Sequence, residues 1–64
     1  SSLSGREREI LRLISRGKLS KEIADQLNIS VHTVNTHRLH ILEKLNADYS
    51  MEAVRYASAR GLLA

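Results

Sequence analysis

The 64-residue sequence contains no cysteine, no proline, no phenylalanine and no tryptophan, and aromatic residues make up only 3% of it. Without cysteine there is neither a disulfide framework nor a thiolate metal site, which suits a reducing cytoplasm. It also lacks the run of roughly 18 apolar residues that a membrane helix needs, and its first residues do not form a signal peptide. We therefore expect a cytoplasmic protein with no membrane partner.

The length and composition of the chain predict one small helical domain spanning 1–64. Hydrophobic residues make up 42% and charged residues 27%, a globular composition that favours helices. A chain this short buries only about 60% of its surface and has little room for an enclosed substrate pocket, so no enzyme is expected. Its net charge of +3 favours polyanionic partners mildly. Because the chain begins with serine instead of methionine, we expect a fragment of a longer protein.

Capping signals divide the chain into helices. Ser4 and Glu7 have the spacing of a capping box, which predicts a first helix over 5–16 that ends before Gly17. Ser20 is the predicted N-cap of a second helix over 20–27. Each helix carries apolar residues at helical spacing on one face.

The second half of the chain continues the pattern. Asn28 tolerates a left-handed backbone, and Ser30 can cap a third helix over 31–45 directly after it. Ser50 is the predicted cap of a fourth helix over 50–60, which Gly61 closes. The predicted fold is a compact all-α domain of four helices. The apolar residues predicted to face inward are, helix by helix, Ile10, Leu11, Leu13 and Ile14; Ile23, Ala24 and Leu27; Val34, Ile41, Leu42 and Leu45; and Ala53, Val54 and Ala57.

The second and third helices have the organisation of a helix-turn-helix, in which the first helix crosses the DNA backbone and the second enters the major groove. Ala24 is small enough for two helices to cross closely there. Apolar side chains at Ile23, Leu27, Ile29 and Val34 fill the space around it. The pattern indicates a DNA-binding module.

The motifs also resemble a known family along essentially the whole chain. They are Leu3 to Leu11 (LSGREREIL), Lys21 to Ala24 (KEIA), Leu27 to Ser30 (LNIS), Thr33 to His37 (TVNTH), Ile41 to Leu45 (ILEKL) and Glu52 to Val54 (EAV). This pattern resembles the LuxR/NarL-type, or GerE-type, DNA-binding domain. The resemblance implies a bacterial transcription regulator, commonly the C-terminal output domain of a two-component response regulator, that binds DNA as a dimer through its last helix.

The sequence departs from that family pattern at several positions. Leu19 and Ser20 stand where the family often has serine and asparagine, so the cap of the second helix can differ. Asn35 replaces a frequent lysine and removes a cation from the presumed groove face. Asp48 and Ser50 occupy the linker in which related domains often carry polar or basic residues that meet the DNA backbone, and neither is among the phosphate contacts predicted here.

Three sets of residues form the predicted DNA-binding and dimer surfaces. Helical spacing turns one row of the third helix away from the core, and asparagine pairs well with adenine while threonine and leucine pack on a thymine methyl. The predicted base-reading residues are Asn35, Thr36, Leu39 and His40. The predicted DNA-backbone contacts are Lys21, Ser30, His32, Thr33, His37 and Lys44. Of these, Lys21, Thr33 and His37 match positions where the family contacts phosphates, as the resemblance implies. The predicted dimer face on the fourth helix is Met51, Arg55, Ser58 and Leu62.

Partners follow from these surfaces. Two copies packed about a two-fold axis would present two recognition helices to an inverted-repeat operator in double-stranded DNA. RNA polymerase is a further candidate partner, and no cofactor is expected. A regulator of this kind would be associated with the bacterial nucleoid when it is bound to DNA.

Several alternatives compete with these assignments. The outward row of the third helix can be merely solvated, and His37 can make a structural hydrogen bond instead of a phosphate contact. The stem of Arg38 is expected to pack while its head reaches solvent or an acid of the first helix. His37, His40 and Glu43 have zinc-like spacing but no further ligand or second shell, so no metal is predicted. The rival function is a helical protein-interaction module that uses the outer face of the fourth helix without DNA.

Overall fold

The computed structural model describes residues 3–63, so Ser1, Ser2 and Ala64 of the predicted domain lie outside the described part. These residues form four helices and no strand, as the sequence predicts. The helices are α1 (Gly5–Ser15), α2 (Ser20–Leu27), α3 (Val31–Leu45) and α4 (Ser50–Ala59). The domain measures 28 × 19 × 19 Å. Between residues 3 and 63 no helix has both the length and the apolar content to cross a bilayer.

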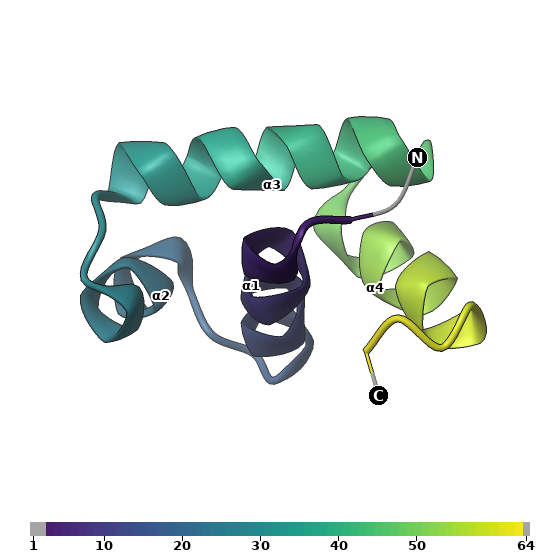
Figure 1. The fold of residues 1–64 in the computed structure, drawn as a ribbon, viewed down its shortest axis with the longest axis horizontal. Coiled ribbons are helices and arrows are strands. Elements are labelled where there is room, and N and C mark those ends of the chain that lie inside the picture. The colour runs from purple at the N-terminus through teal and green to yellow at the C-terminus, as the bar shows by residue number, and fades with distance from the viewer. Residues whose placement is uncertain (1–2, 64) are drawn as a thin grey trace.

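The longest helix, α3, organises the domain. Figure 1 shows α3 lying across the other three helices, with α1 in the middle, α2 on one side of it and α4 on the other. α3 packs against α1, α2 and α4, and α1 also packs against α4. Both ends of α3 are therefore held by neighbours while one side of it is left uncovered.

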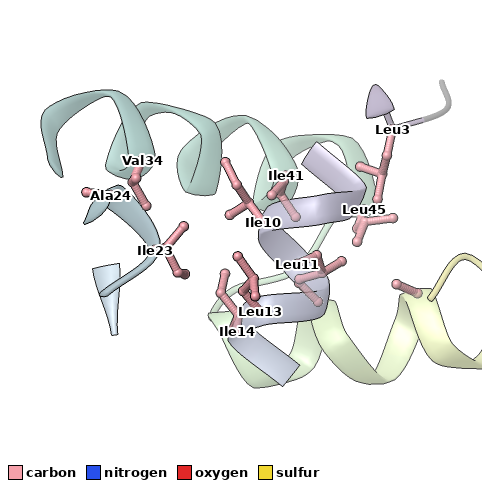
Figure 2. Packing of buried hydrophobic residues seen from close by; sticks show 12 residues of the cluster. Leu3, Ile10, Leu11, Leu13, Ile14, Ile23, Ala24, Val34, Ile41 and Leu45 are labelled. Carbon is pink, nitrogen blue, oxygen red and sulfur yellow. The ribbon is translucent and has the colours of Figure 1, made fainter. Parts of the chain in front are cut away.

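One apolar core joins the four helices (Figure 2). The predicted inner residues of α1 are all buried, and so are those of α3 except Leu42, which is half-buried. Leu27 and Val54, predicted to face inward on α2 and α4, are half-buried against the same core. The buried apolar side chains are Leu3, Ile10, Leu11, Leu13, Ile14, Ile23, Ala24, Val34, Ile41, Leu45, Ala53 and Ala57.

Several predicted caps are confirmed. The Ser4 hydroxyl accepts from the Glu7 N–H at 3.1 Å, and the Glu7 carboxylate accepts from the Ser4 N–H at 2.8 Å, which completes the capping box. The Ser30 hydroxyl accepts from the Thr33 N–H at 3.0 Å at the start of α3. Gly17 and Asn28 have the left-handed backbone expected after a helix, with φ of 85° and 58°.

Two predicted caps are wrong. Ser20 and Ser50 are the first residues of α2 and α4 instead of their caps, and the N-cap positions fall on Leu19 and Tyr49. In α2 the Glu22 carboxylate reaches back to the Leu19 N–H at 2.8 Å. Both serine hydroxyls are engaged by side chains from other parts of the fold, which local capping rules do not register.

The helix ends also differ slightly from the prediction. α1 ends at Ser15 and α4 ends at Ala59, one residue earlier than expected in each case. Gly61, predicted to close the last helix, has a φ of 70°. Asn46 closes α3 in the left-handed region with a φ of 53°.

Candidate nucleic-acid interface

The uncovered side of α3 is the candidate interface. Val34, Ile41 and Leu45 point into the core with at most 2% of their surface exposed. Residues on the opposite side of the same helix are solvent-exposed, as helical spacing predicts. They are His32, Asn35, Thr36, Leu39, His40 and Glu43.

The turn between α2 and α3 positions this surface. The left-handed Asn28 and the following Ile29 both donate their N–H groups to the carbonyl oxygen of Ala24, which ends α2. Ala24 is buried, and Figure 2 shows it beside Val34 of α3. A small residue at this contact lets the two helices approach closely. The geometry is that of a helix-turn-helix with α3 as its second helix.

Thr36 and Leu39 give the exposed row an apolar component. The Thr36 hydroxyl donates to the carbonyl oxygen of His32 at 3.0 Å, within the helix. Its single proton is therefore used internally, so the side chain offers a methyl group and oxygen lone pairs outward. Leu39 is 56% exposed. Both side chains are suited to contact a thymine methyl.

Asn35 is held by a network of side chains. Its Oδ1 accepts from the Ser20 hydroxyl at 2.9 Å, and that hydroxyl accepts from Arg38 Nη1 at 3.3 Å. Arg38 Nη2 donates to the Ser50 hydroxyl at 2.6 Å. The head of the half-buried Arg38 thus bridges α2 and α4, so the expectation of an acid of α1 as its partner is wrong. Of the two acids of α1, Glu9 pairs with Arg6, and Glu7 pairs with another cation.

That cation is Lys44, a predicted phosphate contact. Its Nζ lies 2.8 Å from the Glu7 carboxylate, which is 4% exposed. Burial by itself would raise the pKa of Glu7, but hydrogen bonds from Lys44 and Ser4 outweigh it and leave the pKa below its usual value. Because the ammonium is already paired with a buried carboxylate, the structure gives Lys44 a role in holding α1 to α3.

The other predicted phosphate contacts lie near the start of α2 and in the first two turns of α3, with Ser30 as its cap. The Ser30 hydroxyl caps Thr33 and also donates to Thr33 Oγ1 at 2.9 Å, so its proton is already used. Lys21 and His32 are exposed, and Thr33 is half-buried. His37 is half-buried too, and within residues 3–63 no protein group hydrogen-bonds its ring, so the structural bond considered for it is not found.

The outer face of α4 is partly as predicted. Met51, Arg55 and Ser58 are exposed, but Leu62 lies beyond the end of the helix and packs half-buried against the core. Leu62 therefore does not continue this row, because the chain turns inward after Ala59. Arg55 donates to the Tyr49 hydroxyl at 2.9 Å and lies over its ring at 5.8 Å. This hydrogen bond raises the pKa of Arg55 above its usual value.

Other kinds of site find no support in the described part of the chain. No three His, Cys, Asp or Glu side chains between residues 3 and 63 gather as a metal ion requires, so His37, His40 and Glu43 do not converge. The same residues enclose no pocket. The candidate surface is therefore an open, convex helix face.

Comparison with known proteins identifies the family of this domain. The family model for bacterial regulatory proteins of the luxR family, GerE, matches residues 1–57. The chain belongs to the LuxR family. Its helix-turn-helix is that of a DNA-binding domain of transcription regulators, and the LuxR family is regulatory and not enzymatic.

Individual LuxR-family relatives match nearly the full length of this chain. The chain is 51% identical over 61 residues to the oxygen regulatory protein NreC of Staphylococcus carnosus (strain TM300), covering 95% of this chain and 28% of NreC. It is 45% identical over 62 residues to the uncharacterized response regulatory protein YgeK of Escherichia coli (strain K12), covering 97% of this chain and 42% of YgeK.

A solved structure agrees in fold. The crystal structure of the response regulator ChrA, from a heme-sensing two-component system, superposes with a TM-score of 0.92 at 39% identity. The match covers 97% of this chain and 31% of ChrA. The chain thus spans less than half the length of these LuxR-family relatives.

Proposed function

We propose that this domain binds double-stranded DNA sequence-specifically by placing α3 in the major groove. The observation that carries the proposal is the division of α3 into a buried face and an exposed polar row, in a chain of the LuxR family. An α-helix fits the major groove, where each base pair presents a distinct pattern of donors, acceptors and methyl groups.

The exposed row has the chemistry for reading bases. In the proposal Asn35 hydrogen-bonds to a base edge, Thr36 and Leu39 pack on thymine methyl groups, and His40 contacts the end of the site. Lys21 at the start of α2 and Thr33 at the start of α3 are exposed or half-exposed donors that can bind phosphates, together with His32 and His37. Ser30 and Lys44 are secondary, since their side chains already serve the cap and Glu7.

The domain is further proposed to pair through the outer face of α4. Met51 is 52% exposed, and Arg55 and Ser58 follow it at helical spacing. Two copies related by a two-fold axis would bury this small patch and place two α3 helices about one DNA turn, or 34 Å, apart. The matching operator is an inverted repeat.

In the longer protein that this proposal implies, the domain is the output part of a cytoplasmic bacterial response regulator. Two of the reported relatives are described as response regulators or response regulatory proteins. An input domain would control access of the output domain to DNA at the nucleoid, and RNA polymerase is the natural further partner of such a regulator.

Selection from a randomised duplex library tests the proposal. We expect this chain to enrich one motif, and Thr36→Ala to lose about 1–3 kcal/mol on the enriched duplex but little on a scrambled one. Ser15→Ala, an exposed change at the end of α1 and outside the proposed DNA and dimer surfaces, is the matched control on both duplexes. Equal losses of Thr36→Ala on both duplexes would remove the base-reading role.

Salt dependence separates this function from the rival protein-interaction module. Binding through several phosphates weakens by about 10³ to 10⁵ between roughly 50 and 200 mM salt, because condensed counterions are released. A chain that enriches no duplex, yet associates with protein through Met51 and Arg55 independently of salt, would establish the rival.

A further inference from the structure

The hydrogen-bond network behind Asn35 has a defined direction. Arg38 can only donate, so the Ser20 hydroxyl must accept from it. The single proton of that hydroxyl is then available for Asn35 Oδ1, which lies 2.9 Å away. Ser50 accepts from the other end of the guanidinium at 2.6 Å and fixes it in place. The chain of donors thus runs from Arg38 through Ser20 to Asn35.

This direction orients the amide of Asn35. Its carbonyl oxygen faces Ser20, so the other branch of the planar amide, the NH₂ group, remains for a ligand. No protein group within residues 3–63 accepts from that NH₂ group. Hydrogen bonding to a charged guanidinium polarises the Ser20 hydroxyl and strengthens the bond that it donates.

We infer that Ser20 and Arg38 are positioning residues that make Asn35 a donor toward the base it reads. This inference rests on the proposed function and specifies its base preference. A donor amide fits the acceptors that purines present in the major groove, N7 in both and O6 in guanine, and it is mismatched with the N4 donor of cytosine. The preference of Asn35 is therefore for a purine over cytosine, set partly by residues that touch no base.

Ser20→Ala is a clean variant for testing the network. Ser20 is the first residue of α2 but not its cap, so no capping bond is lost, and alanine favours a helix. Ser15→Ala, which removes an exposed hydroxyl at the end of α1, is the matched control. Ser20→Thr keeps a hydroxyl at the position and is the rescue variant.

The first arm needs no DNA. ¹⁵N relaxation of side-chain amides should show the Asn35 amide more ordered than those of Asn28 and Asn46, exposed asparagines without a side-chain hydrogen bond in the described residues. In Ser20→Ala the Asn35 amide should become as mobile as these two, and in Ser20→Thr it should stay ordered. A parent Asn35 amide as mobile as Asn28 would overturn the inference.

The second arm uses a randomised duplex library and reads the preference at each position. Ser20→Ala should lower the purine-over-cytosine preference at one position by about two- to tenfold, the worth of one hydrogen bond, and Ser20→Thr should retain it. Arg38→Lys, which cannot span both serines, should lower the same preference. Other positions and the thermal midpoint of Ser20→Ala should not change.

A double variant distinguishes positioning from a general structural effect. In the Asn35→Ala background, Ser20→Ala should cause no further loss at that position, because it acts only through Asn35. Additive losses would overturn the inference while leaving the proposed function intact. If the parent chain enriches no motif, the proposed function is overturned, and with it the role of this network in base preference. The relaxation experiment would then report only whether Ser20 orders the Asn35 amide.

Discussion

The two ends of α3 are held in different ways. At the carboxyl end Ile41 and Leu45 are buried, and Lys44 pairs with the buried carboxylate of Glu7. At the amino end Val34 packs near Ala24, but the polar contacts around Asn35 lie at the surface. Both ends are therefore anchored by buried apolar residues, and they differ in their polar contacts: an ion pair with a buried carboxylate at the carboxyl end, and a surface network around Asn35 at the amino end. Substitutions at each end separate the contributions of these contacts.

The largest expected effect is on the apolar contacts of the carboxyl end. Ile41→Ala should lower the free energy of unfolding by about 2–5 kcal/mol, because it leaves a cavity in the core. A core of this size supplies a total of about 3–5 kcal/mol, so the variant should be partly unfolded. Urea unfolding measures the loss. Leu39→Ala, on the exposed side of α3, should stay within about 0.5 kcal/mol of the parent.

The buried ion pair should give the next largest effect. Lys44→Met leaves the Glu7 carboxylate without its cation and should cost about 1–3 kcal/mol of unfolding free energy. Glu9→Gln is the matched control, since Glu9 and Arg6 form an exposed pair at 3.4 Å that is expected to contribute little. Equal effects of the two substitutions would show that α1 is not held to α3 by this pair.

The same pair predicts a pH dependence. Because the folded-state pKa of Glu7 lies below its usual value, its contribution to stability is complete above the unfolded-state pKa of about 4.3. That contribution is lost as the pH falls through the lower folded-state pKa. Unfolding measured between about pH 6 and pH 3 should therefore show a steeper loss in the parent than in Glu7→Gln. Identical pH profiles would contradict the assignment.

The smallest expected effect is on the salt dependence of DNA binding, which distinguishes the role of Lys21 from that of Lys44. Lys21→Ala should make the salt dependence of DNA binding shallower by about one unit, as the loss of one phosphate contact does. Lys44→Met should leave that slope unchanged at a temperature where it is folded, because its ammonium serves Glu7. A slope that changes with Lys44 and not with Lys21 would reverse the two roles.

The sequence predicted what depends on local chemistry. Asn28 after α2, Ser30 before α3 and the pair of Ser4 and Glu7 act within a few residues of the chain, and the structure places each as expected. The alternation of buried and exposed residues on α3 was predictable for the same reason, because it follows from helical periodicity.

What the sequence did not show depends on contacts between helices. Ser20 and Ser50 fit the local rule for a cap, but Arg38 engages both hydroxyls from a different helix. From the sequence, Lys44 is predicted to be a cation available to DNA. Its partner Glu7 is 37 residues away in the chain, and only the packing of α3 on α1 places the two side chains together. Charge and spacing identified these side chains as important but did not identify their partners.

The most direct test of the DNA-binding surface is an NMR titration of the ¹⁵N-labelled chain with a duplex taken from the library selection. Amide shifts should change most at residues 31–40 and at Lys21, and little along the inner face of α1. The same titration with a scrambled duplex should move mainly the phosphate-contacting residues. Unchanged signals over 31–40, with changes confined to the outer face of α4, would contradict the central claim that the amino end of α3 reads DNA.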